Sequence, residues 1–173
     1  MSSVPPVLTA DVLPRVELCA ARLDGEVFAV DESWTCADEP DRPEIRAGAL
    51  ISALPRSSLV ERLVVMGASA AWLHGVIVTP PGRHEFCCLP TQRVNPKPST
   101  RILVRELRLT PADECRIGGL RVTTPRRTAL DLVARARPTA LDLLAVGELV
   151  ARFGLGPLSP AGPDGADQPP FTR

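Results

Sequence analysis

Two glycines between two short strand-like runs, followed directly by a helix-start signal, constrain the fold of this chain most. The runs are residues 114–117 and 120–123, and Gly118-Gly119 joins them. Two glycines here are typical of a two-residue β-hairpin turn, because the favoured turns need positive φ values. A hairpin that leads directly into a helix predicts an α+β fold.

The helix that follows this hairpin has a clear N-terminal signal. The hydroxyl of Thr123 or Thr124 can accept a backbone hydrogen bond at the cap, and Pro125 suits the first helical position. We expect its apolar stripe to consist of Leu130, Val133 and Ala134.

The N-terminal part predicts a helix, a turn and a strand in succession. A helix over residues 14–23 carries a stripe with i, i+3, i+4, i+7 spacing, formed by Val16, Cys19, Ala20 and Leu23. Asp24-Gly25 predicts a turn into a strand over 27–30, and the acidic residues 31–42 predict a loop. We interpret residues 1–36 as an acidic, reduced winged-helix-like unit.

The remaining patterns predict a small mixed helix/strand domain over residues 37–153, with the hairpin and C-terminal helices. Residues 59–65 fit a helix or a strand equally well. Gly75 and Gly154 follow two predicted helices as C-terminal stops, and residues 154–173 predict a disordered Pro/Gly-rich tail. The other expected elements are helices over 43–54, 68–73 and 139–153 and strands over 85–89 and 101–107.

The net charge of zero conceals two halves of opposite sign. Residues 1–45 carry ten acidic groups and three arginines, whereas residues 46–173 carry 17 basic and ten acidic groups. One interpretation is that the two halves face each other across an internal contact. The other is a basic surface for phosphate that the acidic segment masks.

Catalytic and metal chemistry find little support in the residue types. His84, Cys87 and Cys88 are close in sequence, but a strand places the two cysteines on opposite faces, and no second ligand pair follows at zinc-site spacing. We therefore expect no catalytic residues, no metal, no cofactor and no enzyme activity. Five scattered cysteines indicate a reducing, cytoplasmic setting, and we expect neither a signal peptide nor a membrane-spanning segment.

Arg126 and Arg127 lie in the first turn of the predicted helix, where cations oppose the helix dipole. One explanation is an ion pair, either of Arg127 with Asp131 four residues on or with another element. The other is that both guanidinium groups meet a phosphate or a partner's carboxylate. A larger phosphate- or DNA-binding patch would consist of Arg101, Arg105, Arg121, Arg126 and Arg127.

Three segments resemble the AbiEi family of type IV antitoxins in its actinobacterial form. They are residues 69–75 (Ser-Ala-Ala-Trp-Leu-His-Gly), 83–87 (Arg-His-Glu-Phe-Cys) and 119–132, which contains Thr-Thr-Pro-Arg-Arg-Thr-Ala-Leu-Asp. Residues 30–34 form a fourth segment that resembles the family. The whole resemblance spans about residues 8–150. It implies a cytoplasmic, non-enzymatic protein whose winged helix binds duplex DNA at its own promoter. Its C-terminal domain would counteract a nucleotidyltransferase-like toxin without forming a stable complex.

The chain departs from this family pattern at the wing, where basic residues are usual. Asp31 and Glu32 occupy this place. Because phosphate contacts supply most non-specific DNA affinity, an acidic wing weakens duplex binding. The alternative function is a protein-interaction module without DNA binding, or a degenerate family member.

Overall fold

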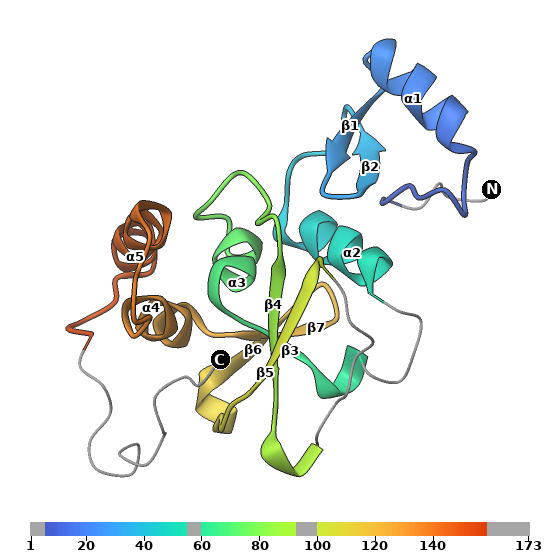
Figure 1. Cartoon of the computed structure of the whole chain (residues 1–173). Helices are drawn as coiled ribbons and strands as arrows, with labels where there is room; N and C mark the ends of the chain where they lie inside the picture. The colour runs from blue at the N-terminus through green and yellow to red at the C-terminus, as the bar shows by residue number, and fades with distance from the viewer. Residues whose placement is uncertain (1–5, 55–59, 93–99, 159–173) are drawn as a thin grey trace.

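The computed structural model describes residues 6–54, 60–92 and 100–158 (Figure 1). It confirms the α+β class, with a two-stranded sheet near the N-terminus, a five-stranded sheet, and helices that include two at the C-terminal end. None of the helices in these three ranges is long and apolar enough to cross a membrane.

The N-terminal unit contains the helix α1 (Arg15–Leu23) and the antiparallel strands β1 (Val27–Val30) and β2 (Ser33–Cys36). The predicted loop over residues 31–42 is therefore wrong for residues 33–36, which form the strand β2. Val30 pairs with Ser33, so Asp31 and Glu32 form a two-residue turn in which Asp31 has a φ of 53°. The burial of Ser33 and Thr35 on one face of β2 explains why this polar segment is a strand. The winged-helix interpretation stays a prediction.

The predicted stripe of α1 faces solvent. Leu18 is the buried residue of this helix, and it packs with Leu8 and Val27 in a small core of the unit. Val16 and Leu23 are 79% and 88% exposed. An apolar stripe shows which residues share a helix face, but the side of the helix that meets the core depends on its neighbours.

The larger sheet has the strand order β5-β4-β3-β7-β6. Its central strand β3 is antiparallel to β4 and parallel to β7, and β4 is parallel to β5. The predicted hairpin is confirmed, because Ile117 pairs with Leu120 and both intervening glycines have positive φ values. The strands are β3 (Val64–Val65), β4 (His84–Cys88), β5 (Ile102–Glu106), β6 (Glu114–Ile117) and β7 (Leu120–Thr123).

Four helices accompany this sheet: α2 (Pro43–Ala53), α3 (Gly67–Leu73), α4 (Pro125–Val133) and α5 (Ala140–Phe153). Short 3-10 turns occupy Val60–Arg62, Pro90–Gln92 and Pro111–Asp113. The main core joins one sheet face to the helices through residues such as Phe86, Val122 and Trp72. The opposite face carries a smaller cluster of Val64, Met66, Cys87 and Leu107.

Two predicted helix ends are confirmed, the cap of α4 and the stop of α5, and α5 begins with a cap that the sequence patterns did not identify. The Thr124 hydroxyl accepts from the Arg127 amide, Thr139 and Asp142 form a capping box, and Gly154 is left-handed. The expected stripe of α4 was wrong, because α4 buries Thr128, Ala129 and Leu132, whereas Val133 is 46% exposed.

The predicted tail begins with residues that pack on the domain. Leu155 and Leu158 are partly buried against the main core. Residues 159–173, which make up the rest of the predicted tail, lie outside the described residues.

Candidate functional site

The strand register places two of the predicted arginines on one face of the sheet. Arg105 on β5 pairs with Cys87, Cys87 with Val64, and Val64 with Arg121 on β7. Directly paired residues point to the same side, so this row lies on the face opposite the main core. Three strand spacings separate Arg105 from Arg121, or about 14 Å.

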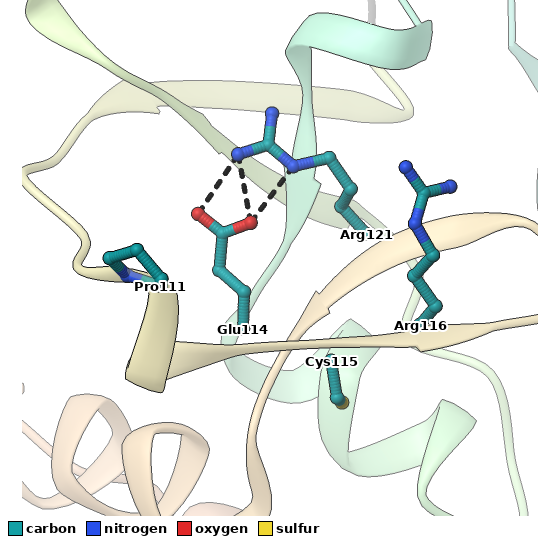
Figure 2. Close-up of a pocket in the computed structure, with 5 residues that line it drawn as sticks. All are labelled: Pro111, Glu114, Cys115, Arg116 and Arg121. Carbon is teal, nitrogen blue, oxygen red and sulfur yellow. Dashed lines mark hydrogen bonds and ion pairs between the residues drawn. The ribbon is translucent and has the colours of Figure 1, made fainter.

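Arg121 is held by its own hairpin. Its Nε and a terminal nitrogen donate to the two carboxylate oxygens of Glu114 at 2.8 and 2.9 Å (Figure 2). A third bond reaches the carbonyl of Glu61 at 3.2 Å. The guanidinium is therefore committed to a bidentate carboxylate partner, the geometry in which arginine binds anions most strongly.

A hollow of about 280 Å³ surrounds this ion pair, lined by Pro111, Glu114, Cys115, Arg116 and Arg121. Arg116 stands beside Arg121 on the same side of the hairpin, whereas Cys115 points to the other side (Figure 2). Arg116 is exposed and donates to the carbonyl of Gly119 at 3.3 Å. The sequence patterns did not select Arg116, whose cross-strand pairing with Arg121 becomes apparent only in the register.

Arg127 forms the i, i+4 ion pair that was one of its two predicted explanations. Its Nε lies 2.9 Å and a terminal nitrogen 2.8 Å from Asp131 Oδ1, and Asp113 is 3.9 Å away. Burial raises the pKa of the Asp131 carboxyl, although Arg127 opposes this effect. Burial lowers the pKa of Arg127, but the hydrogen bond and charge of Asp131 outweigh it and raise that pKa.

Arg126 differs from its neighbour. It is exposed, and its guanidinium donates to the carbonyl of Pro157 at 3.3 Å, whereas Arg121 and Arg127 meet carboxylates. It lies in the first turn of α4, where the helix dipole adds positive potential.

Arg101 reaches the N-terminal unit. A terminal nitrogen lies 2.5 Å from Asp31 Oδ1, and Nε lies 3.1 Å from Glu32. The turn between β1 and β2 thus places its two carboxylates on the arginine that precedes β5. This ion pair supports the interpretation that the oppositely charged halves meet in an internal contact.

The same turn enters a buried hydrogen-bonded chain that the sequence patterns did not reveal. Asp31 Oδ2 lies 3.1 Å from His84 Nε2, and His84 Nδ1 lies 3.2 Å from Ser69 Oγ. Burial raises the pKa of Asp31, but His84 and Arg101 outweigh it and hold that pKa below its ordinary value. His84 and Ser69 are at most 1% exposed. These groups therefore fasten the N-terminal unit to the sheet, where solutes have no access to them.

The remaining histidine and the sheet cysteines are also internal. His74 Nε2 lies 2.8 Å from the carbonyl of Thr123, and burial lowers the pKa of His74. Cys87 and Cys88 face opposite sides of the sheet as expected, in the smaller and the main core respectively. Burial, aided by Asp131, raises the pKa of Cys87 to about 12. Within the described ranges, no group of three His, Cys, Asp or Glu side chains could hold a metal ion.

A family model described as the AbiEi antitoxin C-terminal domain matches residues 63–153. This segment contains the five strands of the larger sheet together with α3, α4 and α5. No curated protein matches the chain. Among solved structures, the chain is similar to the crystal structure of the RV2827C protein from Mycobacterium tuberculosis, with 17% identity and a TM-score of 0.40, covering 85% of this chain and 67% of that one. Because this family model matches more than half of the residues of the chain, the chain belongs to the AbiEi antitoxin family.

Proposed function

We propose that this protein is the cytoplasmic, non-enzymatic antitoxin of a type IV toxin–antitoxin system. In this proposal it regulates its own promoter by binding duplex DNA, and it counteracts a nucleotidyltransferase-like toxin. The observation that carries the antitoxin role is the family match over residues 63–153, which span the larger sheet and the helices α3 to α5.

The arginines rank differently as phosphate contacts. A guanidinium already paired with a carboxylate must exchange that partner for a phosphate, so Arg101, Arg121 and Arg127 gain less on binding DNA. Arg126 gains most, because it is exposed and donates to the uncharged carbonyl group of Pro157. The proposed DNA contacts remain Arg101, Arg105, Arg121, Arg126 and Arg127, with Arg126 as the strongest.

Fluorescence anisotropy of a labelled duplex from the gene's own upstream region, measured at several salt concentrations, tests the DNA-binding part. We expect log affinity to fall linearly with log salt, because bound phosphates release counterions. The variant Arg126→Ala should reduce that slope by about one unit. Arg137→Ala is the matched control, because this exposed arginine follows the other end of α4 and should leave the slope unchanged.

A protein-interaction module without DNA binding is the second candidate, and α5 favours it. Leu141, Leu143 and Leu144 are 52%, 57% and 67% exposed. Several large apolar side chains on one exposed helix are typical of a contact surface for another protein. Rescue of growth from the co-expressed toxin, combined with no duplex binding even at low salt, would favour this candidate over the regulator.

The two roles can be separated by mutation. Leu144→Asp should impair rescue if α5 is the surface that acts on the toxin or its target, and it should leave the salt-dependent duplex binding unchanged. If neither duplex binding nor growth rescue is observed for the wild-type chain, the proposed function is wrong.

A further inference from the structure

The outward side of α1 is apolar over its whole length. Val16 and Leu23 are seven residues apart and are 79% and 88% exposed. The exposed residues Cys19 and Ala20 lie between them on the same side, and Leu18 on the opposite side fills the small core of the unit. Exposed apolar side chains that follow one another along a helix face are typical of a surface that contacts another protein.

The charges of α1 are sorted along the two edges of this stripe. At 100° per residue, Arg15 and Arg22 fall about 90–110° to one side of its centre, and Glu17 and Asp24 fall about as far to the other. All four residues are exposed. One edge of the stripe is therefore basic and the other acidic.

We propose that the outward stripe of α1 docks against the same stripe of a second copy of this chain, with the two helices parallel about a two-fold axis. In this arrangement the basic edge of each helix meets the acidic edge of the other. Arg15 then faces the partner's Glu17, and Arg22 faces the partner's Asp24. An antiparallel pair would place Arg15 against the partner's Arg22, so the charge pattern selects the parallel arrangement.

The parallel arrangement also matches the apolar residues. Val16 meets the partner's Val16 and Leu23 meets the partner's Leu23, as the seven-residue repeat of a two-helix seam requires. Cys19 and Ala20 lie at the centre, where small side chains permit close approach. A nine-residue helix is about 13 Å long, so the contact is small and belongs to the weak, transient class.

Disulfide trapping measures both the contact and its direction. In the full chain carrying Cys19→Ser, either Val16→Cys or Leu23→Cys is added, and oxidised glutathione accepts the two electrons released by each disulfide. We expect each variant alone to form covalent dimers on the order of ten-fold faster than the control Val78→Cys. Val78 is a suitable control because it is 82% exposed and lies outside α1. The Cys19→Ser parent reports any background from the other cysteines.

Two outcomes would overturn the proposal. If Val16→Cys dimerises no faster than Val78→Cys, α1 does not bind a second copy. If disulfides form only in a mixture of Val16→Cys with Leu23→Cys, the helices are antiparallel.

Charge reversal provides an independent test in the chain that retains Cys19. One variant carries Arg15→Glu with Arg22→Glu, and the other carries Glu17→Arg with Asp24→Arg. Each variant alone sets like charges against each other, so trapping through Cys19 should fall to the rate of random collision. Mixing the two, supplied as copies of different mass, should restore hetero-dimers, because both edges are then complementary. Circular dichroism checks that α1 stays folded, and equal trapping in all samples would contradict the charge argument.

Discussion

Gly67, at the start of α3, allows a magnitude to be worked out from the structure. Its φ is 57°, and a Cβ added there would lie 1.9 Å from Glu85 Oε2 and 2.8 Å from a terminal nitrogen of Arg135. The side chains of Glu85 and Arg135 form an ion pair beside this glycine. In Gly67→Ala, Glu85 must therefore swing away and give up this bond.

Two costs add in this variant. The left-handed backbone costs an alanine about 1–2 kcal/mol. Loss of the charge-assisted bond costs roughly 1–2 kcal/mol more, reduced because both side chains are partly exposed. The total of about 2–4 kcal/mol corresponds to a fall in Tm of roughly 4–16 °C for a chain of this length.

Gly154→Ala isolates the backbone cost. Gly154 has a φ of 59°, and nothing lies within 4 Å of an added Cβ. Urea unfolding should show that Gly67→Ala loses about 1–2 kcal/mol more than Gly154→Ala. In a Glu85→Ala background this excess should largely disappear. Equal losses for the two glycine variants in the wild-type background would refute the reasoning.

Three further predictions concern the ionisable groups. Arg127→Ala should lower the free energy of unfolding by about 1–3 kcal/mol, because it leaves the Asp131 carboxylate without its partner. The control Arg126→Ala should change the free energy of unfolding by less than about 0.5 kcal/mol. Equal effects of the two variants in urea unfolding would show that the ion pair does not stabilise the fold. Burial lowers the pKa of His74, so protonation favours the unfolded chain, and stability should fall as the pH drops below the ordinary pKa of 6.5. In thermal melts, His74→Gln should weaken this dependence of stability on pH. An unchanged dependence in the variant would contradict the prediction. The pKa of Asp31 is held below 3.8, so the stability that its charged form contributes is present above that pH and is lost as the pH falls through the lowered pKa. Asp31→Asn should therefore reduce stability at pH 7 and remove the loss in acid. Thermal melts identical to those of the wild type, both at pH 7 and in acid, would exclude the effect.

Local chemistry made several elements predictable from the sequence. Gly118-Gly119 identified the hairpin, and Thr124 with Pro125 identified the start of α4, because turns and caps depend on residues within a few positions of each other. The strand β2 was missed, because its residues are polar and become a strand only through pairing with β1 and burial of Ser33 and Thr35.

The candidate site was less predictable for the same physical reason. The ion pair of Arg127 with Asp131 follows from helical spacing and could be anticipated. The ion pair of Arg101 with Asp31 joins residues that are 70 positions apart, so it depends on how the N-terminal unit lies against the sheet. The exposed stripe of α1 and the exposed Val133 of α4 show likewise that spacing defines which residues share a helix face, but not what packs against that face.

The central strand β3 determines when the domain can form during synthesis. It is two residues long and is bonded on one side to β4 and on the other to β7. Its parallel pairing of Val65 with Val122 closes a long loop of chain, and such non-local contacts form slowly. Until the ribosome has released β7, the emerging chain exposes one edge of β3, and that edge is open to pairing with other chains. The core of this domain therefore cannot close before β7 has left the ribosome, even though β3 and β4 have by then already been synthesised.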